Sequence, residues 1–273
     1  MLPILSSAWP FALSGVLGFL FTGSDVLIIS WLRSASEVGV YSAVIRIIQA
    51  LYIVPLVVQF STLPLLARLA GKDNARFRTA LERTLSMVFF ASVPLTIGGV
   101  ILGTQIMTLA FGTAYRSGGL SFEILMVTLL FDFAASVIIN ALFAYEHQKS
   151  LIISAALGGI INIGLDFILI PVFGIMGSAV ATLVAQAVNN GYLWYAMKKV
   201  NYFTILPHLK KIFAAGIIMG VVTLALYYLG VNVLINVIFS GAIYFLCLRI
   251  FRESLLIEVK RLFFPLKTTP VNS

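Results

Sequence analysis

The chain has 273 residues, of which 60% are hydrophobic and only 10% are charged, and it carries a formal net charge of +8. Its mean hydropathy is +1.06. A soluble domain keeps about a quarter of its residues charged in order to wet its surface, so this composition excludes a soluble globule. The basic residues lie in short clusters between apolar runs, which argues against a nucleic-acid partner. The single cysteine, Cys247, cannot form an intramolecular disulfide.

Eight apolar segments reach or approach the length of a membrane span, which takes about 20 mostly apolar residues in a helix. They are residues 10–32, 40–66, 85–103, 121–144, 151–171, 176–197, 210–228 and 231–250. The sequence therefore predicts an all-α polytopic membrane protein with about eight transmembrane helices.

Prolines and glycines mark the expected kinks and turns. Pro55 and Pro64 each remove a backbone hydrogen bond, so a kink is expected in the second span. Residues 171–177 are expected to link the fifth and sixth spans, and a tight turn at Leu229–Gly230 to separate the last two. The stretch 104–117 is too short to span and is expected to form an interfacial helix or a re-entrant loop.

The distribution of Lys and Arg predicts the side on which each loop lies, because cytoplasmic loops carry an excess of basic residues. If both termini are cytoplasmic, fifteen of the 18 basic residues fall on the cytoplasmic side. Only Arg33 and Arg116 fall on the opposite side, and Arg46 lies within a span. This asymmetry predicts a multi-pass protein with both termini in the cytoplasm.

The region before Arg33 contains no basic residue, although the first helix usually dominates orientation. It also lacks the basic n-region of a cleaved signal peptide. Two explanations are open. Either the later basic loops are sufficient to set the orientation, or this is not the natural beginning of the protein and further helices precede it.

Four ionisable residues interrupt the apolar runs, namely Asp25, Arg46, Asp132 and Asp166. Each costs at least about 2.5–3.5 kcal/mol at a helix centre, so such residues rarely face lipid. In a hairpin joined at residues 33–39, Asp25 and Arg46 both lie roughly 10 Å below the outer face, at 1.5 Å per residue. This matching depth predicts an ion pair, which either locks two helices together or lines a cavity.

Asp132 lies near the bilayer midplane, and its own span contains no Lys or Arg to neutralise it. A desolvated carboxyl group without a cation can carry a proton. Asp132 is therefore a candidate for coupling to a proton or sodium gradient. The alternative is a protonated or hydrogen-bonded carboxyl group that faces a neighbouring helix.

Polar residues also recur at helical spacing in the fifth and sixth spans. Asn162 and Asp166 are four residues apart and share one helix face, and Gln186 and Asn189 form a polar stripe on the next span. Such residues usually make interhelical hydrogen bonds, worth about 0.6 kcal/mol each on average. The other interpretation is that they line a cavity for substrate or ions.

No arrangement typical of an enzyme is present. The only two histidines, His147 and His208, lie in predicted loops without metal-ligand spacing or a nucleophile nearby, and no nucleotide-binding motif occurs. The sequence therefore predicts a protein that is not an enzyme and needs no metal or organic cofactor.

The run from Asn162 to Thr182 contains Ile170-Pro171, Gly174, Gly177 and Ala-Thr at its end. It resembles a stretch of the Wzx-like O-antigen and lipid-linked oligosaccharide flippases, which belong to the multidrug/oligosaccharidyl-lipid/polysaccharide exporter superfamily. A second match is Asp25-Val-Leu-Ile-Ile-Ser with Val38-Gly-Val-Tyr-Ser-Ala and Leu63-Pro-Leu-Leu. The family often has Asn where this chain has Asp166.

This resemblance covers roughly residues 1–250 and implies a domain organisation. Members of the family usually have fourteen helices in two six-helix lobes plus two extra helices. By this resemblance, residues 1–200 are the C-terminal lobe and 201–250 are the two additional helices. Residues 251–273 then form a basic cytoplasmic tail, and an N-terminal lobe is missing.

The resemblance also implies a function. Two lobes rock about a central cavity and carry an undecaprenyl-diphosphate-linked glycan across the bacterial cytoplasmic membrane. Arg46 would then meet the diphosphate, and Asp25 or Asp132 would couple transport to an ion. The implied partners are the lipid-linked oligosaccharide, membrane lipid and the missing lobe or other polysaccharide-assembly proteins.

Two further classes compete with the flippase. A drug/cation antiporter of the same superfamily would share the fold. A membrane-embedded enzyme such as a glycan polymerase should have a large polar outer loop, and the longest one here is about 104–120.

Overall fold

The computed structural model describes residues 23–253 and 255–256, and every regular element in this part of the chain is a helix. In chain order they are the helical segment Gly23–Leu32, α2 (Ala35–Leu51), α3 (Ile53–Leu69), α4 (Asn74–Phe111), the short 3-10 helix η1 (Thr113–Gly118), α5 (Gly119–Ala144), α6 (Gln148–Phe173), α7 (Ile175–Val200), α8 (Leu206–Tyr228) and α9 (Val233–Ile250). The predicted all-α fold is confirmed.

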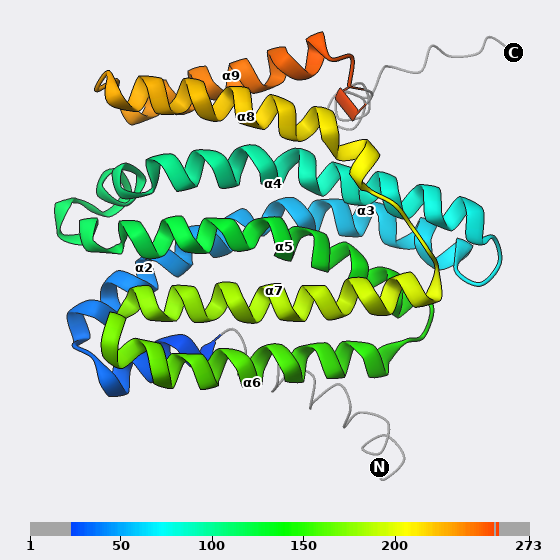
Figure 1. Cartoon of the computed structure of the whole chain (residues 1–273), viewed down its shortest axis with the longest axis horizontal. Coiled ribbons are helices and arrows are strands. Elements are labelled where there is room, and N and C mark those ends of the chain that lie inside the picture. Colours follow the sequence, from blue (N-terminus) through cyan, green and yellow to red (C-terminus); the bar gives the residue numbers. More distant parts are fainter. Residues whose placement is uncertain (1–22, 254, 257–273) are drawn as a thin grey trace, which may run out of the picture.

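The long helices lie side by side with their axes nearly aligned (Figure 1). The order across the molecule is α6, α7, α5, α4 and α8, with each helix in contact with the next, and α9 packs on α8 and α4. The helices α2 and α3 pack against this row, where α2 contacts α5 and α3 contacts both α4 and α5. The core therefore lies between α2/α3 and the row, and between α4 and the α8–α9 pair.

Six helical stretches of the described chain are long and apolar enough to cross a membrane, so the chain is a multi-pass membrane protein. They are Ala35–Leu69, Asn74–Phe111, Thr113–Ala144, Gln148–Phe173, Leu206–Tyr228 and Val233–Ile250. The helix α7 is also long, at 26 residues, but it is not among these six apolar stretches. Its polar residues lower its hydropathy, and they lie on the face described below. Most of the first predicted span, and of the tail after residue 250, falls outside the described residues.

The second predicted span is interrupted, as the prolines predict. The helices α2 and α3 meet at Tyr52, which is not helical, and α3 begins at Ile53. Pro55 has no N–H group to donate to the carbonyl of Leu51, so the regular hydrogen-bond pattern is lost at this point. Pro64 lies within α3 without ending it.

The expectation for residues 104–117 is wrong in its first half. Residues 104–111 continue α4, which ends only at Gly112, where φ is +92°. Nothing before Gly112 breaks the helix, so α4 reaches 38 residues and a length of about 57 Å at 1.5 Å per residue. This exceeds the roughly 30 Å of a hydrocarbon core. The surplus lies largely in the basic segment that begins at Asn74.

The expected link at residues 171–177 is also shorter than predicted. Pro171 lies inside the last turn of α6, where its missing N–H group costs a single hydrogen bond. The helix ends at Phe173, and Gly174 alone, with φ of +61°, separates it from α7. Glycine adopts this left-handed conformation without steric cost, which makes the one-residue turn accessible.

Glycines let neighbouring helices approach closely, as is common in membrane proteins. Gly99 and Gly103 of α4 face α5, and a Cβ atom at either would collide with Met126 or Glu123. On the other side of α4, Gly216 and Gly220 of α8 leave no room for a Cβ beside Val93 and Ile97. Because lipid tails are as apolar as these side chains, close packing supplies most of the attraction between the helices.

We expect the Gly119→Ala variant to lower the free energy of unfolding by about 1–3 kcal/mol, as overpacking generally does. Its new methyl group would lie 2.8 Å from Cα of Thr104, a backbone atom that no side-chain rotation can move. Gly98→Ala is the matched control, because nothing lies within 4 Å of the added atom. Thermal unfolding in detergent micelles measures both, and equal stability of the two variants would contradict this packing.

We also expect the loops to alternate across the membrane as the basic residues predict. Single cysteines at the exposed positions Ser36 and Ser117 should react with an impermeant thiol reagent from outside the cell. Cysteines at the exposed Lys72 and Lys199 should react only after the cells are opened. The measurement uses a Cys247→Ser background. Labelling of the opposite pair in intact cells would reverse the orientation.

Candidate functional site

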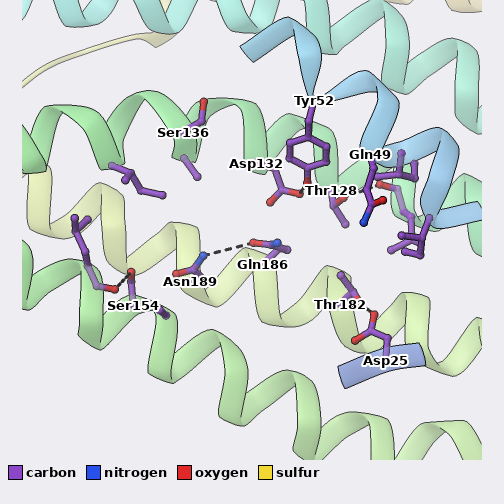
Figure 2. A pocket seen from close by; sticks show the side chains of 17 residues that line it. Asp25, Gln49, Tyr52, Thr128, Asp132, Ser136, Ser154, Thr182, Gln186 and Asn189 are labelled. Atoms are coloured by element: carbon purple, nitrogen blue, oxygen red, sulfur yellow. Dashed lines mark hydrogen bonds between the residues drawn. The ribbon is translucent and has the colours of Figure 1, made fainter. Parts of the chain in front are cut away.

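A cavity of about 480 Å³ lies between the helices α2, α5, α6 and α7 (Figure 2). The polar residues that line it are three or four positions apart in the sequence, and such residues share one face of a helix. The helix α5 contributes Thr128, Asp132 and Ser136, and α7 contributes Thr182, Gln186 and Asn189. Further polar groups come from Asp25, Gln49, Tyr52 and Ser154. Among the described residues that line it, two are carboxylic acids and none is Lys or Arg.

Asp132 forms a hydrogen bond across the cavity wall. It is buried, and its Oδ2 accepts a hydrogen bond from the hydroxyl of Tyr52. Tyr52 stands at the break between α2 and α3, and Figure 2 shows its phenol ring directed toward Asp132. The break therefore places a hydroxyl on a carboxyl group from a helix 80 positions away in the chain. Asp132 is therefore hydrogen-bonded to a residue next to a neighbouring helix and also lines the cavity, and its coupling to an ion stays a prediction.

A second carboxyl group, that of Asp25, anchors a buried polar cluster at the cavity wall. Its Oδ2 accepts hydrogen bonds from the hydroxyls of Tyr41, at 2.7 Å, and Thr182, at 2.8 Å. Asn162 extends the cluster, since its amide group donates to Thr182 Oγ1 at 3.3 Å and accepts from Ser24 at 3.1 Å. Through these contacts the cluster joins the segment Gly23–Leu32 to α2, α6 and α7.

Asp166 completes this cluster from α6, one turn after Asn162. It is fully buried, and neither carboxyl oxygen has a hydrogen-bond donor in the described chain. Its carboxyl group is close enough to that of Asp25 for their charges to influence each other, and the Oδ1 of Asp25 likewise has no hydrogen-bond donor among the described residues. Two ionised carboxylates only accept hydrogen bonds and repel each other, so this pair requires a proton or a bound cation.

The oxygen atoms of this cluster suit a hard monovalent cation as well as a proton. Carboxylate, amide and hydroxyl oxygens are the ligands that such cations prefer. Asp25 and Thr182 also line the cavity, whereas Asp166 and Asn162 lie behind them. A cation that enters through the cavity would therefore reach the pair from the side of Asp25. Within the described residues no group of three or more His, Cys, Asp or Glu side chains could hold a metal ion.

The expected ion pair between Asp25 and Arg46 is wrong. Asp25 is bound by Tyr41 and Thr182, and Arg46 is exposed and forms no ion pair with it. Matching depth is not enough, because Arg46 is five residues after Tyr41 and therefore points roughly 140° away around the helix. Arg46 follows the lining residue Ile45 on α2, and it is not itself part of the lining.

Of the polar residues at helical spacing, Gln186 and Asn189 line the cavity, whereas Asn162 and Asp166 do not; a role of any of them in a substrate or ion pathway stays a prediction. The two amides lie close together, with Asn189 Nδ2 at 3.5 Å from Gln186 Oε1, as the dashed line in Figure 2 shows. Sequence reasoning missed Tyr41 and Tyr52. Their signal was available, because a buried tyrosine hydroxyl in an apolar span needs a polar partner.

Comparison with known proteins places this fold and cavity in a family. The family model described as lipid II flippase MurJ matches residues 11–251. The probable flippase AglR of Haloferax volcanii is 28% identical over 170 residues, which cover 61% of this chain and 36% of that protein. A putative O-antigen transporter of Shigella flexneri is 25% identical over 160 residues, 58% of this chain and 37% of that protein.

A solved structure, a lipid II flippase MurJ in an inward closed conformation, shares the fold. It superposes with a TM-score of 0.74 at 22% identity, over 92% of this chain and 54% of that chain. The chain spans about a third to a half of the length of the curated relatives that it matches. The resemblance predicted from residues 162–182 is confirmed by these matches. Because the family match covers most of its length, the chain belongs to the MurJ family of the multidrug/oligosaccharidyl-lipid/polysaccharide exporter superfamily.

Proposed function

We propose that this chain is the C-terminal lobe of a transporter that flips a lipid-linked oligosaccharide across the cytoplasmic membrane by alternating access. The family match and the flippase relatives support this proposal. The observation that carries it is a cavity between helices whose mainly apolar lining includes carboxyl, hydroxyl and amide groups, because polar groups at membrane depth are costly unless they serve a pathway. Transporter sites generally lie near the midplane between two lobes, so a second lobe would supply the facing wall.

Arg46 is the proposed contact for the diphosphate of the lipid carrier, which would be undecaprenyl in a bacterium. It is an exposed cation on α2, the helix that also carries the lining residues Ile45 and Gln49. A guanidinium group binds phosphate oxygens with two parallel hydrogen bonds and keeps its charge at any physiological pH. It would therefore hold the anionic part of the substrate while the glycan moves through the polar pathway.

The Asp25–Asp166 pair is the proposed coupling site for sodium or a proton. A cation between the two carboxylates removes their repulsion and draws Gly23–Leu32, α6 and α7 together. Without the cation, either the helices would separate or one of the two carboxylates would take up a proton. Binding that favours one arrangement of the helices shifts the population toward it, which is how an ion gradient drives alternating access.

An antiporter for organic cations would share the fold and the cation site. The flippase relatives favour the glycan, since both relatives described above are named as flippases or O-antigen transporters. A polymerase receives no support from the described loops, because the turns at 112–118 and 229–232 are short.

The flippase proposal predicts complementation of a strain that lacks its O-antigen flippase. Residues 1–273 expressed together with the N-terminal lobe of a MurJ-family flippase should restore surface glycan, whereas either half alone should not. Arg46→Ala should reduce the restored glycan about tenfold or more, because one charge-assisted contact is lost. Arg46→Lys should reduce it less.

Arg68→Ala is the matched control for this experiment, because Arg68 is also exposed and lies away from the cavity, at the end of α3. It should leave the amount of surface glycan unchanged. The absence of surface glycan in every arm, with the protein present in the membrane, would contradict the flippase proposal.

The coupling proposal predicts that sodium or acid stabilises the purified chain. At 100 times its Kd a bound ion stabilises the folded state by about 2.7 kcal/mol, so the unfolding temperature should rise with sodium relative to choline, or on acidification. Asp25→Asn and Asp166→Asn should abolish this rise. Asp132→Asn, which alters a buried carboxyl group outside the cluster, should retain it. An ion response that survives both cluster variants would rule out this site.

A further inference from the structure

We propose that a second cavity, between the end of α4 and the turn that joins α8 to α9, binds the phosphate group of a membrane lipid. It lies at the end of the bundle that the distribution of basic residues predicts to be outside the cell. Its volume of about 650 Å³ is within the roughly 300–1,000 Å³ of pockets that enclose small ligands. This inference does not depend on the flippase function, because the two cavities share no lining residue.

Separate stretches of the chain meet at this second cavity. Figure 1 shows the connection between α4 and α5 and the turn between α8 and α9 at the same end of the molecule. The main polar groups of the lining are Gln105 and Thr108 of α4, Thr113 and Arg116 of η1, Tyr227 of α8, and Asn232 just before α9. A ligand there would therefore contact α4, η1 and the α8–α9 pair at once.

Arg116 gives this cavity a positive charge. Its side chain is exposed and forms no ion pair with any described residue. The other basic residue predicted on this side, Arg33, is already bound to Glu37 by hydrogen bonds of 2.6 and 3.0 Å. A guanidinium group binds two oxygens of a phosphate at once and stays charged. Among the described residues on this side, Arg116 is therefore the basic group that is left to bind an anion.

The charge of the second cavity is opposite to that of the first. Among the described residues that line it, none is Asp or Glu. Glu123 of α5 lies behind the wall, where its Oε1 accepts hydrogen bonds from the N–H group of Thr104, at 3.2 Å, and from its hydroxyl, at 3.1 Å. The first cavity is lined by two carboxylic acids. A cleft whose charge is of one sign attracts ligands of the other sign, so an anion is favoured here.

The neutral groups of the lining suit the rest of a lipid head group. The Oε1 atom of Gln105 is buried and has no hydrogen-bond partner among the described residues, which costs free energy until a ligand supplies a donor. Asn232 caps α9 by accepting from the N–H group of Leu234 at 2.9 Å, which leaves its Nδ2 available to donate. A phosphate ester that carries hydroxyls matches this set, since its phosphate accepts from Arg116 and Asn232 and its hydroxyl donates to Gln105.

The surroundings of the cavity indicate a ligand that is anchored in lipid. Leu109, which lines the cavity, is 53% exposed, and Leu229, next to the turn, is 77% exposed. The rings of Tyr227 and Tyr228 are 5.5 Å apart, and tyrosine is enriched at the depth of the lipid head groups. A lipid can therefore bring its phosphate to Arg116 while its chains stay in the membrane.

A lipid bound in this way would hold the α8–α9 pair against the rest of the bundle. Tyr227 and Asn232 belong to this pair, whereas Gln105 and Arg116 belong to α4 and η1, on the other side of the cavity. A ligand that binds only the packed arrangement stabilises that arrangement. The lipid would therefore act as a further contact between α4 and the α8–α9 pair.

Binding of lipids to the purified full chain in a neutral detergent tests this inference. The probes are dioctanoyl-phosphatidylglycerol, dioctanoyl-phosphatidylcholine, farnesyl diphosphate and inorganic phosphate, and native mass spectrometry measures the dissociation constants. We expect phosphatidylglycerol to bind about tenfold or more tightly than phosphatidylcholine, whose choline places a like charge near Arg116. Inorganic phosphate should bind more weakly than either anionic lipid.

Two variants lower the charge of the cavity by different means. Arg116→Ala should weaken the binding of phosphatidylglycerol about tenfold or more, because a charge-assisted contact is lost. Asn232→Asp should also weaken it, since it replaces a donor with a negative charge but keeps an oxygen that caps α9. Arg33→Ala is the matched control, because it removes the same charge on the same side but outside the cavity, and it should leave binding unchanged. Unfolding temperatures without lipid show whether each variant is folded.

Farnesyl diphosphate distinguishes the two sources of a lipid phosphate. Only the part of its binding that Arg116→Ala removes belongs to this cavity, because Arg46 is the proposed contact for a diphosphate elsewhere. If this part is tighter than the binding of phosphatidylglycerol, the site takes a prenyl diphosphate. If it is weaker, the site takes a phospholipid of the bilayer. Either result supports a site for a lipid phosphate.

Two results would overturn the inference. Equal binding of phosphatidylglycerol and phosphatidylcholine, unchanged by Arg116→Ala and Asn232→Asp, would show that lipids coat this end of the bundle without a specific site. Inorganic phosphate that binds as tightly as phosphatidylglycerol would make the cavity a site for soluble anions. Neither result bears on the restoration of surface glycan, so the flippase proposal is tested separately.

Discussion

The contact between the carboxyl groups of Asp25 and Asp166 constrains how the helices around the cavity pack. Neither group has a basic partner among the residues that the structure describes, and both are almost completely buried. Hydroxyl groups from α2 and α7 and an amide group from α6 surround them, so the cluster resembles a preformed shell of oxygen ligands. A change in the charge held there changes the forces on Gly23–Leu32, α2, α6 and α7 at once. The remaining polar groups of the cavity are arranged around this shell.

The helix α7 is long but falls outside the six most apolar stretches, and its polar residues lie against the cavity. The helix α7 carries Thr182, Gln186 and Asn189 on one face, and this face lies against the cavity. On its other sides α7 packs against α5 and α6. The polar groups are therefore kept away from lipid, where each unsatisfied group would cost several kcal/mol in hydrocarbon.

Sequence patterns predicted the fold well where the signal was local. Apolar runs located the spans, and Pro55 indicated the break that the structure places at Tyr52. Sequence patterns predicted less well which side chains of a helix face which neighbour, because this depends on the rotation of the helix about its axis. Asp25 and Arg46 have the expected depth, yet Tyr41 is the residue of α2 that faces Asp25. Residues 104–111 looked like a separate element only because Gly112, which ends α4, comes late. The partners of Asp132 and Asp166 come from distant positions that a single sequence does not link.

The one-residue turn at Gly174 has a mechanical consequence. The helices α6 and α7 are joined with no spare length of chain, and they pack along each other from that turn. We therefore expect the two helices to move together as one lever. Asn162, Asp166 and Thr182 are fixed to this lever, while Asp25 and Tyr41 belong to other segments. A small opening between Asp25 and Asp166 would then be amplified along the hairpin, and the largest displacement would occur at its far end, near residues 145–147 and 201–205.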